Sequence, residues 1–197
     1  MATLSHNPHG APREGYTGAK RSLILAGGGM RLSYQAGAIR ALLEEGLCFS
    51  HVDSTSGGSL NHAMLFSGLS PAQMCDRWHT LNPKDFVSFL PMDQYLKLGN
   101  IQAMGSADNI IDKVIPHLGI DMDKVNAVDG MEGTFNVCNY THKVNEVIGH
   151  KEMDVDFLVA GMSLPGVWPP VKKGDVLYHD SAFMRDANLM EAVIRGA

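Results

Sequence analysis

The stretch Ser54-Thr55-Ser56-Gly57-Gly58 decides the fold, because it joins a short apolar run to a helical pattern. Residues 49–53 before it are typical of a short strand, and residues 58–67 after it place apolar side chains at helical intervals. A serine on a tight strand-to-helix turn exposes its hydroxyl at the N-terminus of a helix. An ordinary turn rich in Ser and Gly explains the same residues, so the surrounding sequence has to decide.

A second strand, turn and helix lie upstream of this stretch. Residues 22–26, Ser-Leu-Ile-Leu-Ala, predict a buried strand that feeds the turn Gly27-Gly28-Gly29. Apolar residues then recur at helical spacing from Leu32 to Leu43, and Gly46 ends the helix. Two strand-turn-helix units in succession form a βαβ motif. The sequence therefore predicts an α/β fold with a parallel sheet.

The rest of the chain carries further predicted elements and one irregular segment. Helices are expected over 72–80, after Ser106 and from Asp154, and strands over 133–139, 144–148 and 176–178. From Pro83 to Gly105 the apolar residues follow no clean period. That segment is either a cover over a binding cleft or a plain surface excursion.

Length and composition limit the classes of protein that the chain can belong to. A chain of 197 residues, 45% hydrophobic and 19% charged, fits one soluble globular domain. The formal net charge of −5 argues against a nucleic-acid partner, because no basic stripe is present to neutralise phosphates. No apolar run is long enough to span a membrane.

The N-terminus and the cysteines point to a cytoplasmic protein. Residues 1–20 are polar and rich in Gly, Pro and His, which predicts a flexible leader without the apolar core of a signal peptide. Cys48, Cys75 and Cys138 lie far apart and form no C-x-x-C pair, so reduced thiols are expected rather than a disulfide framework or a zinc site. No ligand cluster for a metal is visible, and no metal or other cofactor is expected.

Three turns follow predicted strands, at Gly27–Gly29, Ser54–Gly58 and Asp180–Ala182. In an open parallel sheet the carboxyl ends of the strands share one edge, where ligands and catalytic groups gather. We therefore expect the three turns to lie close together although they are far apart in the sequence.

The glycine turn suits an oxyanion hole, because its backbone N–H groups stand at a helix start and a ligand oxygen can approach them closely. A dinucleotide fingerprint is the competing interpretation. That fingerprint requires a third glycine where this chain has Leu32.

A nucleophilic serine needs a base. A triad in the order Ser, Asp, His is not available with Asp180, because no histidine follows it. His179 with Asp154 or Asp175, and His62 on the helix after Ser56, stay open as histidine bases. Asp180 is the better-placed partner, since an oriented carboxylate can act as the base directly.

Several motifs, taken together and in order, resemble those of patatin-like phospholipases. They are Gly27-Gly28-Gly29-Met30-Arg31, Tyr34-Gln35-Ala36-Gly37, Thr55-Ser56-Gly57-Gly58-Ser59-Leu60-Asn61, Pro165-Gly166-Val167-Trp168-Pro169-Pro170 and Asp180-Ser181-Ala182. The resemblance covers residues 21–197. It implies a three-layer α/β/α fold with a mainly parallel central sheet, and a Ser–Asp dyad that cleaves acyl esters of lipids.

The resemblance also implies a role for each site residue. Ser56 is the nucleophile, and Asp180 activates it and later the deacylating water. The backbone of Gly27, Gly28 and Gly29 holds the oxyanion, and Arg31 braces that loop. Ser54 and Gly58 flank the nucleophile in the strand-to-helix turn.

Three positions depart from the family pattern. Ser54 replaces the first glycine of G-x-S-x-G, Ser181 replaces the glycine after the aspartate, and Leu32 stands where members often have glycine. The family usually adds more sheet and helices after the helix at which Ala197 stands. A domain truncated at its C-terminus and a natural short form are both consistent with this.

The expected function is a serine lipid acyl hydrolase of the phospholipase A or lysophospholipase type, acting on lipid or acyl-ester substrates with peripheral membrane contact. The alternatives are a catalytically impaired lipid-binding or regulatory module and, on weaker grounds, a nucleotide-binding α/β domain. The sequence does not indicate the head group, acyl length or oligomeric state.

Overall fold

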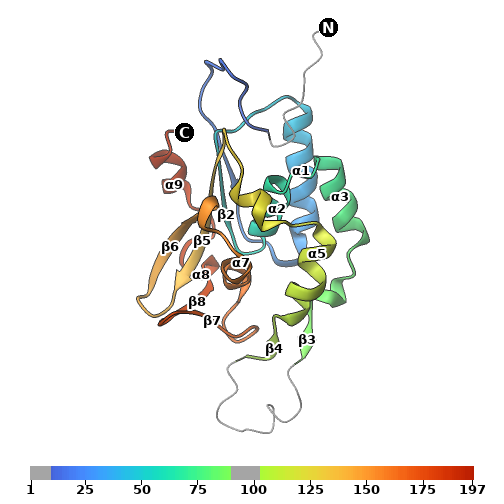
Figure 1. Ribbon diagram of the computed structural model, residues 1–197, viewed down its shortest axis with the longest axis vertical. Coiled ribbons are helices and arrows are strands. Elements are labelled where there is room, and N and C mark those ends of the chain that lie inside the picture. The colour runs from blue at the N-terminus through green and yellow to red at the C-terminus, as the bar shows by residue number, and fades with distance from the viewer. Residues whose placement is uncertain (1–9, 90–102) are drawn as a thin grey trace.

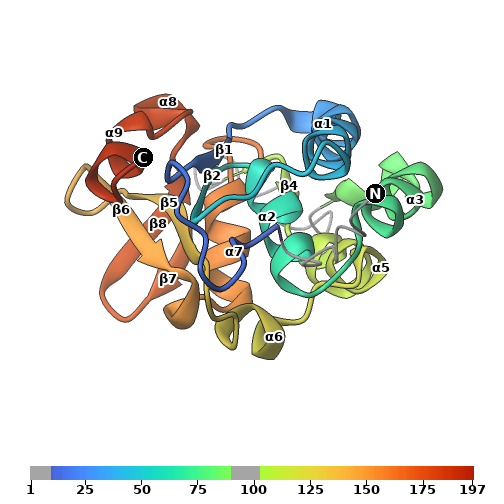
Figure 2. The ribbon, with the colours of Figure 1, turned by 90° about the horizontal axis from the view of Figure 1, so that it is seen from above.

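The computed structural model of the chain describes residues 10–89 and 103–197. Its architecture is the expected α/β fold, in which helices cover both faces of a central sheet (Figures 1 and 2). Residues 1–9 of the expected leader, and residues 90–102 of the irregular segment, lie outside the described part. Residues 10–20 form no helix or strand, but Ala11 is buried and the Gly10 carbonyl accepts a hydrogen bond from the Phe49 N–H at 2.8 Å.

The central sheet has six strands and the described helices are mostly short. The strands are β1 (Ser22–Leu25), β2 (His51–Thr55), β5 (Glu132–Asn139), β6 (Val144–Gly149), β7 (Val171–Lys173) and β8 (Val176–Asp180), and a separate pair is formed by β3 (Ser88–Phe89) and β4 (Gly105–Ser106). The α-helices are α1 (Leu32–Glu44), α2 (Gly58–Phe66), α3 (Pro71–Thr80), α5 (Ile115–Leu118), α6 (Met122–Asn126), α7 (Val155–Met162), α8 (Ala182–Arg185) and α9 (Leu189–Ile194). Three 3-10 helices (Gly29–Arg31, Pro83–Phe86 and His150–Glu152) and a π-helical segment (Ile110–Val114) complete the description.

Strands β1, β2 and β5 form the parallel part of the sheet that the βαβ motif predicts. Strands β6 and β8 pair with β5 in the antiparallel sense, and β7 forms a hairpin with β8. Because β6 pairs with β5 from Thr134 to Asn139, β2 and β8 share the other edge of β5. They occupy it one after the other, and their C-terminal ends meet head to head.

Most predicted boundaries agree with the structure. Ser70 caps α3 in a capping box with Gln73, and Asp154 caps α7 by accepting from the Phe157 N–H at 2.8 Å. Strand β2 starts two residues later than expected and runs on to Thr55. Strand β7 and helix α6 were not expected from the pattern, because both are too short to show a period.

The two faces of the sheet differ in polarity. Helices α2 and α7 pack on one face with α1, α3 and α5 outside them, and that face is apolar, with Val52, Phe135 and Val137 buried. The other face, covered by α9, carries a buried network of hydrogen-bonded polar residues. In this network His51 Nε2 donates to Thr134 Oγ1, and Thr134 Oγ1 donates to Asp53 Oδ2 at 2.6 Å. Asn136 Nδ2 donates to both Asp53 oxygens.

This polar face changes two pKa values. Burial is the main cause that raises the pKa of Asp53 to about 6, and the hydrogen bonds from Thr134 and Asn136 oppose it. Burial likewise lowers the pKa of His51 to about 4, which keeps the ring neutral. A neutral ring matches its contacts, in which Nδ1 accepts from Ser22 Oγ while Nε2 donates to Thr134.

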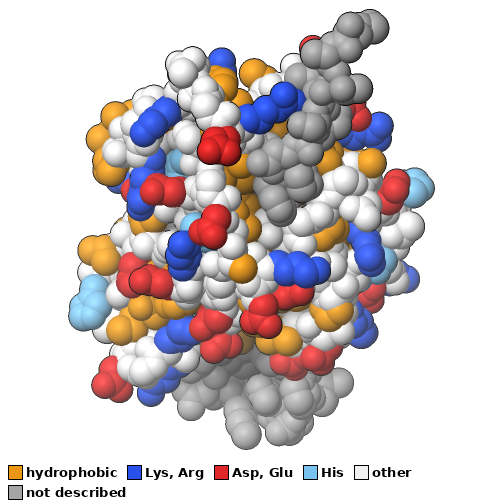
Figure 3. All heavy atoms as spheres, turned by 45° about the horizontal axis from the view of Figure 1, so that its top comes forward, with side chains coloured by type: hydrophobic (Ala, Val, Ile, Leu, Met, Phe, Trp, Pro, Cys, Tyr) orange, Lys and Arg blue, Asp and Glu red, His pale blue; other side chains and the backbone are white. Residues whose placement is uncertain are grey.

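The surface mixes charges of both signs. On the face shown in Figure 3, basic and acidic side chains are interspersed rather than separated into large patches. No helix within residues 10–89 and 103–197 combines the length and apolar character that crossing a membrane requires. All three cysteines are free.

Ser54 is buried in β2, and its side chain contacts helix α2. Its Oγ lies 2.9 Å from Nδ1 of His62, a completely buried histidine whose ring stacks on Phe135 at 4.0 Å between centroids. The other ring nitrogen, His62 Nε2, has no hydrogen-bond partner in the described part of the chain. Burial lowers the pKa of His62 well below its usual value, so the ring is neutral.

We predict that Ser54→Gly, which restores the glycine of the family pattern, destabilises the protein. The change leaves both ring nitrogens of a buried histidine unpartnered, which costs about 1–3 kcal/mol of unfolding free energy. Urea unfolding followed by circular dichroism measures it. Ser54→Ala is the matched control, because it removes the hydroxyl without the extra backbone freedom of glycine. An unchanged unfolding free energy in Ser54→Ala would contradict the assigned role of the hydroxyl.

Candidate active site

Ser56 lies on the turn between β2 and α2, and its backbone conformation is strained. Its φ of 54° lies in the left-handed region, where a non-glycine residue costs about 1–3 kcal/mol. The two glycines after it are closely packed, and at Gly58 the neighbour is backbone. A Cβ on Gly58 would lie 2.1 Å from the Leu25 carbonyl oxygen, and one on Gly57 would lie 2.6 Å from Leu32 Cδ1. The predicted sharp turn is therefore present, and Leu32 fills the space that Gly57 leaves free.

Ser56 and Asp180 meet in this structure, as the sequence predicts. Ser56 Oγ donates a hydrogen bond to Asp180 Oδ2 at 2.5 Å, and the second carboxylate oxygen accepts from the Ala182 N–H at 2.8 Å. The reason for their meeting differs from the expected one. Strand β8 is antiparallel to β5, and its last residue, Asp180, pairs with Val137. Strand β2 ends beside Asn136, the residue before Val137, so the two strand ends are adjacent.

The Asp180 carboxyl is almost completely buried, with 2% of its surface exposed. Burial raises its pKa to about 6. The hydrogen bonds from Ser56 and the Ala182 N–H lower it, and the nearby charge of Asp186 raises it again. Above about pH 6 the group is therefore an ionised acceptor in contact with a hydroxyl, which is the state that a general base requires.

The glycine loop lies against Ser56. A Cβ on Gly27 would lie 2.6 Å from Asp186 Oδ1, 3.0 Å from Ser56 Cβ and 3.5 Å from Ser56 Oγ, so a side chain there would crowd the serine. Gly29 has a φ of +53°, the conformation that glycine favours. Arg31 donates two hydrogen bonds to the Gly28 carbonyl, one from its backbone N–H and a weaker one from Nε at 3.5 Å. The loop is thus folded back on itself beside the serine.

The histidines that the sequence left open as bases are engaged elsewhere. His179 Nδ1 donates to the Ser163 carbonyl at 2.9 Å, and His62 is bonded to Ser54. Asp154 caps α7 and pairs with Lys173. In the described part of the chain, the side-chain partner of Ser56 Oγ is Asp180 alone.

Two residues at the site were not identified from the sequence. Asp186 Oδ1 accepts a hydrogen bond from the Gly27 N–H at 3.0 Å, across 159 positions of sequence. Asn145 on β6 accepts a hydrogen bond from Ser181 Oγ, which gives the serine that replaces the family glycine a polar partner. Spacing could not reveal either contact, because each depends on how β6, α8 and β1 are placed in three dimensions.

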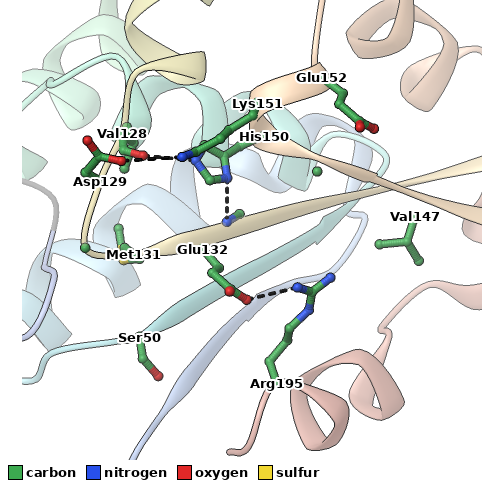
Figure 4. Close-up of a pocket in the computed structure, with 13 residues that line it drawn as sticks. Ser50, Val128, Asp129, Met131, Glu132, Val147, His150, Lys151, Glu152 and Arg195 are labelled. Atoms are coloured by element: carbon green, nitrogen blue, oxygen red, sulfur yellow. Dashed lines mark hydrogen bonds and ion pairs between the residues drawn. The ribbon is translucent and has the colours of Figure 1, made fainter.

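A hollow of about 590 Å³ lies away from Ser56, at the opposite end of β2 and β5 (Figure 4). Two ion pairs lie along it, with Arg195 3.0 Å from Glu132 and Lys151 3.5 Å from Asp129. His150 is held by the Gly133 N–H and the Val128 carbonyl. None of its lining residues belongs to the candidate site, so the hollow does not extend that site.

Within the described residues, no group of three or more His, Cys, Asp or Glu side chains is arranged to hold a metal ion. The groups that the structure places at Ser56 are its hydroxyl, the buried Asp180 carboxyl and the backbone of the glycine loop.

Two known proteins illustrate what this chain is similar to. An uncharacterised NTE family protein of Mycobacterium tuberculosis is 25% identical over 205 residues, which cover 96% of this chain and 32% of that protein. The chain thus spans about a third of the length of this curated relative. The crystal structure of VipD from Legionella pneumophila superposes with a TM-score of 0.59 at 14% identity, over 85% of this chain and 46% of VipD. This second likeness shows the fold.

A model of the patatin-like phospholipase family matches residues 23–193, which is most of the chain and includes every candidate site residue. The family resemblance expected from the ordered motifs is thereby confirmed. The chain belongs to the patatin-like phospholipase family.

Proposed function

We propose that the chain is a serine lipid acyl hydrolase, an esterase of the phospholipase A or lysophospholipase type, in which Ser56 and Asp180 form a catalytic dyad. The observation that carries the proposal is the 2.5 Å hydrogen bond from a serine in a strained turn to a buried carboxylate. Family membership supports a lipid substrate. Phe183 and Met184 of α8, 79% and 46% exposed, offer apolar surface close to Asp180 for acyl chains or a lipid surface.

In the first step Ser56 Oγ attacks the acyl carbonyl carbon while Asp180 Oδ2 takes the hydroxyl proton. The carbonyl oxygen becomes an oxyanion, and N–H groups of Gly27, Gly28 and Gly29 are the proposed donors that stabilise it. The intermediate then collapses to the acyl-enzyme. The alcohol part of the lipid leaves with the proton that Asp180 held.

In the second step a water molecule attacks the acyl carbonyl carbon of the Ser56 ester, and Asp180 removes the proton of that water. A second oxyanion forms at the glycine loop. Its collapse breaks the bond to Ser56 Oγ, which recovers the proton, and releases the fatty acid. The raised pKa of Asp180 suits both proton transfers, since a base that titrates near the working pH exchanges protons efficiently.

One contact favours the alternative of a lipid-binding module with impaired turnover. The Asp186 carboxylate engages the Gly27 N–H, one of the three proposed oxyanion donors. Labelling with a fluorophosphonate probe decides between the two functions, because only an active acyl-transfer enzyme reacts covalently with such a probe.

We predict that a fluorophosphonate probe labels the wild-type chain and fails to label Ser56→Ala. Asp180→Asn keeps the shape of the side chain but cannot accept the proton, so ester hydrolysis should fall by about 10²–10⁴-fold. Labelling is measured by intact mass spectrometry, and hydrolysis with a soluble ester and a lysophospholipid. Ser67→Ala, which removes a buried hydroxyl outside the site, is the matched control.

Two outcomes would count against this proposal. The lipid-binding alternative would be favoured if folded protein neither reacted with the probe nor hydrolysed either substrate, both as the wild type and as Asp186→Ala. Near-normal hydrolysis by Asp180→Asn would exclude the dyad and favour a histidine as the base.

The pKa of Asp180 predicts the acid limb of the pH profile. Protonation removes the base, so kcat/KM on a soluble ester should fall about tenfold per pH unit below a pKa of about 6. Circular dichroism at each pH separates this loss from unfolding. A profile that stays flat through one unit below that pKa would show that the ionised Asp180 is not required.

A further inference from the structure

The contact between Asp186 and the glycine loop places a second carboxylate at the reacting centre. Asp186 Oδ1 accepts from the Gly27 N–H at 3.0 Å. It also lies 2.6 Å from the point at which a Cβ on Gly27 would stand, and that point is 3.5 Å from Ser56 Oγ. We propose that Asp186 is a gate on the oxyanion hole, which holds the Gly27 N–H until the carboxylate moves away and releases it to the substrate. This inference rests on the proposed acyl hydrolase function.

The electrostatics of the contact oppose acyl transfer. The oxyanion needs N–H donors, and a carboxylate on one of them takes a donor away from it. A fixed negative charge beside the developing oxyanion also repels it, most strongly where water is excluded. Both effects favour the resting site over the transition state for as long as the carboxylate stays on the loop.

The position of Asp186 allows the carboxylate to leave. It is an exposed residue that follows the short helix α8, so its side chain can turn into water without losing buried contacts. The backbone beside it is held separately, because the Arg185 carbonyl accepts from Thr55 Oγ1 at 3.2 Å and Asn188 caps α9. A change of side-chain rotamer is therefore sufficient to open the gate.

A structural brace is the competing role for the same contact. A brace would hold the glycine loop in shape by its hydrogen bond, and its loss would slow the reaction. A gate blocks the donor, and its loss speeds the reaction. The two roles therefore predict effects of opposite sign, which a single rate measurement distinguishes.

The test is the second-order rate constant for labelling of Ser56 by a fluorophosphonate at neutral pH, together with turnover of a soluble ester. For Asp186→Ala we expect both rates to rise by about tenfold or more, since one oxyanion donor is worth about 10²–10³ in rate. Asp186→Asn keeps an acceptor on Gly27 without the charge and should give a smaller rise. Asp112→Ala, which removes an exposed carboxylate on the π-helical segment, is the matched control and should change neither rate.

A second readout tests whether the charge of Asp186 acts at the reacting centre. The neighbouring groups that change the pKa of Asp180 are Ser56, the Ala182 N–H, Asp186 and His179. Because Asp186 raises the pKa of Asp180, its removal should move the acid limb of the pH profile to lower pH. An acid limb that does not move would contradict the placement of this charge at the reacting centre.

Each outcome decides one question. Slower labelling of Asp186→Ala, with Asp186→Asn at the wild-type rate, would overturn the gate and assign Asp186 as a brace. Equal rates in the wild type and both variants would also overturn it. If neither the wild type nor Asp186→Ala reacts, the proposed function itself fails and the gate fails with it. Labelling of Asp186→Ala alone, absent when Ser56→Ala is added, would support both.

Discussion

The candidate site depends on the way in which two strands share one edge of β5. Strand β2 pairs with β5 up to Asn136, and β8 arrives from the opposite direction and ends with Asp180 opposite Val137. The strand ends meet, so a serine just after one and a carboxylate at the end of the other come within 2.5 Å. Burial on both sides of this junction gives the carboxyl its raised pKa. A shift of β8 by one residue would turn Asp180 to the other face of the sheet.

The positions at which the family resemblance implies glycine are accommodated by specific neighbours. Ser54 Oγ is bonded to the buried His62 ring, and Ser181 Oγ donates to Asn145. Leu32 packs over Gly57, where an added Cβ would displace the Leu32 side chain. Polar partners thus stand beside the two serines, and the departures from the pattern are part of the packing of this chain. The left-handed conformation in this turn falls on Ser56, the residue whose hydroxyl reaches Asp180.

The sequence was sufficient to predict the βαβ unit, the turn at Ser56 and the two residues that meet there. These features are local, since apolar periodicity and glycine placement specify a strand, a turn and a helix within a few residues. It could not predict the antiparallel direction of β8, because the short strand β7 that forms its hairpin carries no recognisable period. Nor could it predict the contact of Asp186 with Gly27 or of Ser181 with Asn145, which depend on side-chain placement across distant elements. The polar face of the sheet under α9 was missed for the same reason.

We propose that the meeting of β2 and β8 builds an acyl-transfer site in which the glycine loop receives the negative oxygen. A crystal structure of the fluorophosphonate adduct tests this most directly, because its tetrahedral phosphorus imitates the intermediate. We expect phosphorus bonded to Ser56 Oγ, with the phosphonyl oxygen within hydrogen-bond distance of N–H groups of Gly27–Gly29. Phosphorus on another residue, or a phosphonyl oxygen directed away from the glycine loop, would contradict it.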